Sequence, residues 1–487
     1  MDGTKDQLDQ LKLIDDLQRL DISKHFDDQI RIILDNIFPQ TIKHCRDEHL
    51  EKDLYATALQ FRLLRQHGYH VPQEVFYSFM DDVGNCKMCL CGDLKGILCL
   101  YEASFLSVEG ETILDLAKDF LAYHLRELIR LEQITDMALA ELVKHALELP
   151  LHWRVKKLEA KWFINFYESG PDANPILLEL AKLDFNMVQA QYQDDIKHMS
   201  KWYEDTGGLQ KKLSFARYRL AECFLLAIGF ALEPHLGDAR KILTKGAIFV
   251  TIIDDIYDVY GTLKELQVFT ETIERWDINE LDRLPEYMRI CFLALFNFAN
   301  ELAYDILRDQ GVNIIPNLKN LYHDGYFPSI NEYLNTAWIS SSGPVALFHT
   351  YFITTNPINK KELQYLEQYP GIIRWTSMVL RLVNDLGTTT DEMKKGDVPK
   401  SIQCYMEETD CSGEDAHGYI RNLIDMALKR MDKDILKENP VRGFGATVMN
   451  VARIILCIYQ HGDGFGSPHS ETKKNMVSLI VNLISMS

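Results

Sequence analysis

Apolar residues recur along most of this chain at the spacing of an α-helix. Two clear leucine series, each with spacings of four and then three residues, are Leu13, Leu17, Leu20 and Leu121, Leu125, Leu128. Residues three and four apart lie on one face of a helix, so each series predicts an amphipathic helix with one buried side. We find no alternating series typical of a strand. The pattern predicts an all-α fold.

Length and turn residues predict two helical domains. With 487 residues, the chain exceeds the size of one ordinary hydrophobic core. The densest group of chain-turning residues is Ser169-Gly-Pro-Asp-Ala-Asn-Pro, which is typical of a linker. We therefore expect an N-terminal domain over residues 1–172 and a C-terminal domain over residues 173–487.

Composition excludes several functional classes. The chain has 52 Lys and Arg residues against 71 Asp and Glu, a net charge of −19, which argues against nucleic-acid binding. No apolar run approaches the length of a membrane helix, so no membrane insertion is expected. The acidic first residues lack the features of a secretion signal or transit peptide. We expect a cytoplasmic protein, or a plastid one if the true N-terminus is longer.

Four of the ten cysteines are close together in the sequence: Cys86, Cys89, Cys91 and Cys99. The first pair has CxxC spacing, which is compatible with zinc. The second pair lacks that spacing and no histidine follows closely, so buried, reduced thiols are the preferred interpretation.

Three carboxylates, Asp254, Asp255 and Asp258, directly follow the apolar stretch 247–253. In a helix, Asp254 and Asp258 lie on the same face, next to Asp255. Like charges this close repel one another, and partial burial increases the cost. A hard cation relieves the repulsion, and carboxylates with open coordination positions suit Mg²⁺ bound to a phosphate. The run predicts a site for a metal and a diphosphate.

A second stripe of oxygen donors occurs in R-L-V-N-D-L-G-T-T-T-D-E. Asn384, Thr388 and Glu392 are four residues apart and share one helix face, which predicts a second hard-metal site. Basic residues that could bind phosphate oxygens are Arg217, Arg219, Arg381 and Lys400. Together these groups predict two oxygen-rich metal walls with cations around them.

These motifs resemble those of plant class I terpene synthases, most closely the angiosperm monoterpene synthases. D-D-I-Y-D matches the family's aspartate-rich DDxxD motif, and N-D-L-G-T-T-T-D-E matches its second metal-binding motif. R-Y-R-L-A-E stands where the family has R-D-R-x-x-E, and the similarity covers nearly the whole chain. The resemblance implies two all-α domains: a C-terminal domain with the class I terpenoid synthase fold and an N-terminal relic α-barrel.

The resemblance also implies a mechanism, in which three Mg²⁺ ions, with Mn²⁺ as an alternative, hold a prenyl diphosphate while it ionises to a carbocation. The implied metal ligands are Asp254, Asp258, Asn384, Thr388 and Glu392. The implied catalytic residues are Asp254, Asp255, Asp258, Arg217 and Arg381. Substrate binding is assigned to Arg217, Arg219, Asp254, Asp258, Arg381, Asn384, Lys400, Trp338 and Tyr459. The enzyme is expected to be a lyase, and a monomer or weak homodimer.

Aromatic rings and a broken helix are expected to form the hydrocarbon pocket. Trp338, Tyr257 and Tyr459 could stabilise a cation through their ring faces. The segment Trp338-Ile-Ser-Ser-Ser-Gly-Pro resembles the family's broken helix, and Gly343-Pro344 gives a physical reason for the break.

Three departures from the family pattern bear on the substrate. The tandem-arginine segment at the N-terminus is absent, Leu226 stands where the family usually has Trp, and the chain between Asn317 and Tyr322 is shorter by about three helical turns. Geranyl diphosphate is the favoured substrate. The alternatives are farnesyl diphosphate, giving a sesquiterpene synthase, or a catalytically impaired relative.

Two other enzyme classes are less consistent with the motifs. A synthase that elongates prenyl chains would have a second DDxxD in place of N-D-L-G-T-T-T-D-E. A dinucleotide enzyme is suggested by Gly462-Asp-Gly-Phe-Gly, but this run follows a helical pattern instead of a strand, so a loop between helices is expected.

Overall fold

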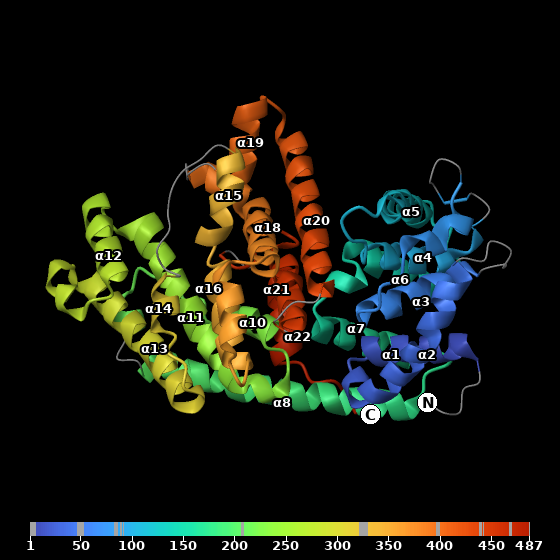
Figure 1. Cartoon of the computed structure of the whole chain (residues 1–487), viewed down its shortest axis with the longest axis horizontal. Helices are drawn as coiled ribbons and strands as arrows, with labels where there is room; N and C mark the ends of the chain where they lie inside the picture. Colours follow the sequence, from blue (N-terminus) through green and yellow to red (C-terminus); the bar gives the residue numbers. More distant parts are fainter. Residues whose placement is uncertain are drawn as a thin grey trace. The chain divides into compact units, whose positions relative to one another are not determined.

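The protein is built from α-helices, as the computed structural model in Figure 1 shows. The structure describes residues 6–45, 53–81, 86–87, 90, 92–205, 209–320, 330–395, 400–437, 441, 443–466 and 470–486. Within these ranges the extended backbone amounts to one isolated bridge, between Met80 and Cys86. The predicted all-α fold is confirmed.

The first compact unit comprises residues 1–186 together with 484–487. Its helices are α1 (Gln7–Arg19), α2 (Asp27–Cys45), α3 (Leu54–Gln66), α4 (Leu94–Ser104), α5 (Thr112–Arg130), α6 (Met137–Glu148) and α7 (Lys156–Glu168). Four of them begin after an aspartate whose side chain accepts a backbone N–H of the first turn: Asp6, Asp53, Asp93 and Asp136. In the predicted leucine series, Leu17, Leu20, Leu121 and Leu125 are buried in the core. The helical periodicity therefore identifies the buried faces of α1 and α5.

The second compact unit comprises residues 187–483. Its helices are α9 (Leu209–Lys212), α10 (Leu220–Phe230), α11 (Gly237–Asp255), α12 (Leu263–Arg275), α13 (Glu286–Gln310), α14 (Ile315–Asn320), α15 (Ile330–Ser340), α16 (Gly343–Thr354), α17 (Lys360–Glu367), α18 (Gly371–Lys395), α19 (Ser401–Thr409), α20 (Gly413–Leu436), α21 (Phe444–Tyr459) and α22 (Ser470–Ile480). Helix α10 packs against α11 and α21, and α18 packs against α16, α20 and α21 (Figure 1).

The long helix α8 (Pro175–Asp205) belongs to both units. The predicted boundary at residues 172/173 falls in the turn before α8, whereas the compact units divide inside the helix, after Asn186. The Asn186 side chain donates to the carbonyl oxygen of Ile484 at 2.9 Å and accepts its N–H at 2.9 Å. Turn residues in the sequence indicate where the helix begins, but they do not indicate at which residue of the helix its contacts pass from one compact unit to the other.

Helix α13 is long and apolar enough to cross a membrane by length and composition alone. It has 25 residues and a mean hydropathy of 1.4 in its most apolar window, contrary to the expectation that no segment would reach this length. Its inner face, with Met288, Cys291, Phe292 and Leu295 at 0% exposure, packs into hydrophobic cores. Buried core helices of globular proteins meet the same criterion.

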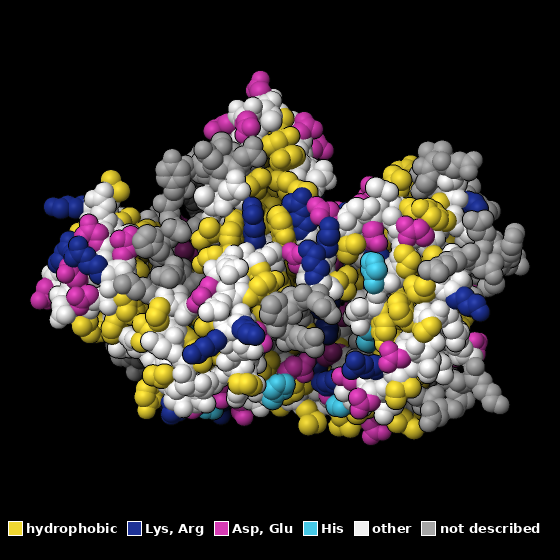
Figure 2. All heavy atoms as spheres, viewed as in Figure 1, with side chains coloured by type: hydrophobic (Ala, Val, Ile, Leu, Met, Phe, Trp, Pro, Cys, Tyr) yellow, Lys and Arg dark blue, Asp and Glu magenta, His cyan; other side chains and the backbone are white. Residues whose placement is uncertain are grey.

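The cysteine cluster is only partly described. Cys86 and Cys99 are buried free thiols, as preferred from the sequence, and burial raises the pKa of the Cys99 thiol. Cys89 and Cys91 lie outside the described residues. Acidic side chains are interspersed with Lys and Arg on the face drawn in Figure 2, in keeping with the net charge of −19.

Candidate active site

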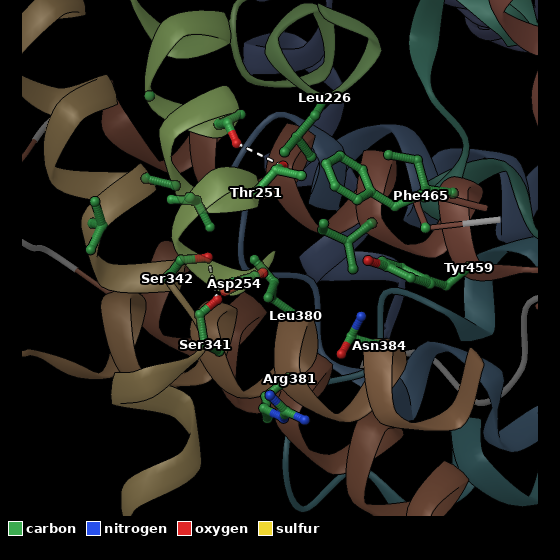
Figure 3. A pocket seen from close by; sticks show the side chains of 18 of the residues that line it. Leu226, Thr251, Asp254, Ser341, Ser342, Leu380, Arg381, Asn384, Tyr459 and Phe465 are labelled. Carbon is green, nitrogen blue, oxygen red and sulfur yellow. Dashed lines mark hydrogen bonds between the residues drawn. The ribbon is translucent and has the colours of Figure 1, made fainter. Parts of the chain in front are cut away.

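A cavity of about 430 Å³ lies within the second unit. Its lining comes from helices α10, α11, α16, α18 and α21, from the π-turn after α11, from the residues just before α10, α16 and α19, and from the loop after α21. The predicted site residues found there are Arg217, Asp254, Asp258, Arg381, Asn384, Thr388, Lys400 and Tyr459. Figure 3 shows Asp254, Asn384 and Tyr459 around a common space. Residues from five separate segments of the sequence thus meet in one cavity.

The acidic wall lies where α11 ends. The helix runs to Asp255 and continues as one π-helical turn over Ile256–Tyr260. The predicted α-helical spacing across this run is therefore wrong for its last turn, because a π-turn holds more residues than an α-turn. Asp254 and Asp258 nevertheless both line the cavity. π-turns within α-helices are frequent at functional sites.

The Asp254 carboxyl group is poorly stabilised as an anion in the protein alone. It is accessible from the cavity, yet the surrounding protein displaces most of the water near it. This desolvation, together with the negative charge of Asp258, raises the pKa of Asp254 from 3.8 to about 7, although Arg217 and Arg381 oppose the shift. A bound cation would remove the conflict.

Asp255 does not line the cavity, although the sequence assigned it a catalytic role. The residue is 3% exposed. One oxygen accepts the backbone N–H of Arg217 at 2.7 Å, and the other accepts the Arg217 Nε–H at 2.6 Å. Asp255 therefore orients Arg217, whose side chain is 43% exposed and lines the cavity. The structure places Asp255 where it acts through Arg217.

The second wall is a face of α18. Asn384 and Thr388 line the cavity, and the Thr388 hydroxyl donates to the Asn384 carbonyl oxygen at 3.0 Å. This bond uses the hydroxyl proton and leaves the oxygen lone pairs for another partner. The Asn384 side chain hydrogen-bonds the Tyr459 phenol. Glu392 lies on α18, but its side chain is outside the described residues.

The donor set fits a hard divalent cation. Two carboxylates occupy one wall, and an amide and a hydroxyl occupy the other. Oxygen donors of this kind are those that Mg²⁺ prefers. No group of three His, Cys, Asp or Glu side chains that could hold a metal occurs in the described part of the chain. The described donors are instead two carboxylates on one wall and two neutral oxygen groups on the other.

Among the described residues, the cations that line the cavity are Arg217, Arg381 and Lys400. Arg381 forms an ion pair with the fully buried Asp385, one helical turn away. The other Asp385 oxygen accepts the Ser401 N–H at 3.4 Å, which links α18 to the start of α19 beside Lys400. The remaining predicted cation, Arg219, does not line the cavity, and donates instead to the carbonyl oxygen of Gly466.

The predicted aromatic residues have different positions. Tyr459 lines the cavity, whereas Trp338 and Tyr257 do not. Trp338 is 6% exposed and donates its indole N–H to the Asn335 carbonyl oxygen at 3.0 Å. The Tyr257 hydroxyl hydrogen-bonds Thr270 at 2.7 Å.

The predicted helix break is present between α15 and α16. Ser342 has a left-handed backbone with φ of 58°, and α16 begins at Gly343. A Cβ atom at Gly343 would lie 2.7 Å from the Ser377 Oγ and 3.0 Å from the Ser377 Cα, so only glycine permits this approach to α18. Ser341 and Ser342 line the cavity beside Asp254 (Figure 3).

The loop after α21 contributes lining residues that the sequence did not identify. Asp463 and Phe465 line the cavity. The Asp463 carboxylate accepts the N–H groups of Phe465 at 3.2 Å and Gly466 at 2.6 Å, which shapes the loop as an Asx turn. The Gly462-Asp-Gly-Phe-Gly run is thus a loop, as expected. The run of an Asp, a Gly and an aromatic residue was the sequence signal from which these lining residues could have been predicted.

Comparisons with protein families match both parts of the chain. The model described as "Terpene synthase, N-terminal domain" matches residues 1–147. The model described as "Terpene synthase family, metal binding domain" matches residues 206–430, which include both metal walls.

Individual proteins with known names are similar over nearly the full length. Trans-alpha-bergamotene synthase from Phyla dulcis is 64% identical, covering 99% of this chain and 91% of that protein. (−)-alpha-terpineol synthase from Vitis vinifera is 53% identical, covering 99% and 83%. Isoprene synthase from grey poplar, solved with three Mg²⁺ ions and dimethylallyl-S-thiolodiphosphate, is 44% identical with a TM-score of 0.91, covering 99% and 94%.

Proposed function

The chain belongs to the terpene synthase family of lyases that act on prenyl diphosphates, and we propose that it is a Mg²⁺-dependent sesquiterpene synthase using farnesyl diphosphate. The observation that carries this proposal is one cavity with two chemically different ends. Oxygen donors and cations surround Asp254, and an apolar lining continues along α11 as far as Ile242.

At the polar end, Asp254 and Asp258 on one wall and Asn384 and Thr388 on the other would hold Mg²⁺. Glu392 would complete this set, as the family resemblance implies. When bound, the metal supplies a Lewis acid for the departing diphosphate. Three ions per site, as in the isoprene synthase structure, and replacement by Mn²⁺ are parts of the proposal.

The protein's own groups bind the diphosphate and protect the carbocation. Arg217, Arg381 and Lys400 donate hydrogen bonds to the diphosphate oxygens, which keeps the leaving group away from the cation. The apolar lining excludes water that would otherwise capture the cation. The rings of Tyr459 and Phe465 offer electron-rich faces to the positive charge.

The substrate proposal departs from the preference for geranyl diphosphate in the sequence analysis. A synthase named for the sesquiterpene bergamotene is the more similar relative, at 64% identity. The apolar lining also extends from Asp254 to Ile242, twelve residues or about 18 Å of helix. A farnesyl chain, built from bonds of about 1.5 Å, spans roughly 14 Å when extended and a geranyl chain roughly 9 Å.

Geranyl diphosphate is the second candidate, because the alpha-terpineol synthase relative is 53% identical. Purified protein is incubated with each diphosphate and Mg²⁺, and the volatile products are analysed by gas chromatography and mass spectrometry. We expect the higher kcat/KM with farnesyl diphosphate and no product with EDTA. A preference for the geranyl substrate supports the second candidate, and no product with either substrate refutes the enzyme.

Mg²⁺ affinity is expected to fall as the pH falls through 7. The pKa of Asp254 is raised to about 7, so its carboxyl group is largely ionised at pH 8 and largely protonated at pH 6, where protons compete with the metal. Mg²⁺ titrations followed by tryptophan fluorescence should show about a tenfold loss of affinity between these values. An Mg²⁺ affinity that is the same at pH 6 and pH 8 would contradict this cause.

Leu226→Trp is expected to reduce kcat/KM with farnesyl diphosphate about tenfold. Leu226 lines the cavity from α10, and the larger indole would occupy space needed by the hydrocarbon. Leu226→Met, which keeps a similar volume, is the control and should retain activity within about threefold. An unchanged rate and product profile in Leu226→Trp would show that this position does not contact the substrate.

A further inference from the structure

Gly246 lies in the interior of α11 without a packing reason for being glycine. A Cβ atom built there would meet only the Phe298 ring, at 3.8 and 3.9 Å, which is ordinary van der Waals contact. By contrast, a Cβ at Gly229 on α10 would lie 2.2 Å from Ile454. Glycine in a helix interior is less favourable than alanine. The fold would therefore accept, and be stabilised by, alanine at position 246.

The missing side chain lies in the cavity. Ile242, Gly246, Val250 and Asp254 follow one another at intervals of four residues on α11, and all four line the cavity. Residues with this spacing share a helix face, so a side chain at position 246 would point the same way as its neighbours. Because Phe298 stands in contact with the Cβ position, the further atoms of a longer side chain would turn into the cavity.

The region around Gly246 suits a hydrocarbon. His349 on α16 also lines the cavity, and its ring stacks parallel to Phe298 with centroids 6.2 Å apart. The His349 Nδ1–H donates to the Val345 carbonyl oxygen at 2.7 Å, and burial lowers the pKa of the imidazole. The lowered pKa favours the neutral imidazole at pH 7, and the described lining residues of α11 from Ile242 to Val250 carry no charge.

Gly246 lies about 12 Å from Asp254 along the helix axis, and Ile242 lies about 18 Å away. The diphosphate takes up the part nearest Asp254. An extended geranyl chain of roughly 9 Å then ends near Gly246, whereas a farnesyl chain of roughly 14 Å continues past it. We propose that Gly246 determines the chain length accepted by the cavity, because the absence of a side chain leaves room for the third isoprene unit. This inference rests on the proposed farnesyl specificity.

The test compares Gly246→Ala and Gly246→Leu with the same changes at Gly418 on α20. A Cβ at Gly418 would meet no atom within 4 Å, and Gly418 does not line the cavity. The readouts are kcat/KM for farnesyl and geranyl diphosphates with Mg²⁺, and the dissociation constants of their thiolodiphosphate analogues measured by calorimetry. Melting temperatures establish that each variant is folded.

Gly246→Leu should lower kcat/KM and analogue affinity at least tenfold for the farnesyl chain and less than threefold for the geranyl chain. Gly246→Ala should raise Tm by about 2 °C. It should also lower the ratio of kcat/KM for the farnesyl chain to that for the geranyl chain, by a smaller factor than Gly246→Leu does. The Gly418 variants should leave the ratio unchanged.

Equal losses for both chains in Gly246→Leu, or no change for either, would overturn the inference while leaving the proposed function intact. If Gly246→Leu is unfolded, an unchanged ratio in the folded Gly246→Ala would overturn it. A wild-type protein that neither turns over farnesyl diphosphate nor binds its analogue more tightly than the geranyl one would refute the proposed function itself.

Discussion

Asp254→Asn reduces kcat/KM with the preferred prenyl diphosphate by at least about a thousandfold, while the protein remains folded. The change removes one of two carboxylates on the acidic wall and keeps the size of the side chain. The remaining donors there, Asp258 and the neutral amide, carry too little negative charge to hold Mg²⁺ against hydration. Gas chromatography of the product measures the loss of activity, and Mg²⁺ titration measures the loss of metal affinity.

The matched control for this variant is Asp238→Asn on the same helix. The Asp238 side chain is 91% exposed and pairs with Lys241 at the surface, so the change removes an equal charge outside the cavity. Its activity should stay within about twofold of wild type, since isolated surface pairs contribute little. Retained turnover in Asp254→Asn at saturating Mg²⁺ would remove Asp254 from the metal site.

Arg240→Met lowers the free energy of unfolding by about 3–5 kcal/mol, the largest effect on stability that we expect. Arg240 on α11 is 0% exposed. Its guanidinium donates to Asp195 on α8 at 2.8 Å and to the carbonyl oxygens of Ala231 at 2.8 Å and Glu233 at 2.6 Å. Methionine fills much of the space but leaves the buried Asp195 carboxylate without its cation.

Urea denaturation of the whole protein measures the loss, with the adjacent Lys241→Met as control. Lys241 is on the same helix, 30% exposed, and its partner Asp238 is at the surface, so a change within about 0.5 kcal/mol is expected. The double variant Arg240→Met with Asp195→Leu should recover part of the stability, because it removes the uncompensated charge as well. No recovery would mean that Arg240 acts mainly through the carbonyl oxygens of Ala231, Glu233 and Pro234.

Much of the fold and of the metal site could be predicted from the sequence because each depends on short-range spacing. The leucine series marked buried faces of α1 and α5, and Gly343-Pro344 marked the break before α16. Asn384 and Thr388 could be placed on one wall because residues four apart in an α-helix lie on the same face.

Features that depend on packing between distant segments could not be predicted. Nothing near Asp255 in the sequence indicates that both its oxygens are taken by Arg217, 38 residues away. The depth of the cavity beside Gly246 likewise depends on Phe298 and His349, which belong to other helices. From the sequence alone, a glycine within a helical pattern indicates only a position of low helix propensity, because its packing environment is not known.

The bond between Asp255 and Arg217 uses the geometry of the arginine side chain. Asp255 accepts the backbone N–H and the Nε–H of Arg217, and the guanidinium has two further nitrogens that can donate to an anion in the cavity that Arg217 lines. A lysine ammonium has three donors on one nitrogen, but it lacks the planar fork that binds a carboxylate through Nε–H and offers two separate nitrogens to an anion. The acidic motif thus has two roles. Two of its carboxylates line the cavity, and the third holds an arginine that also lines the cavity.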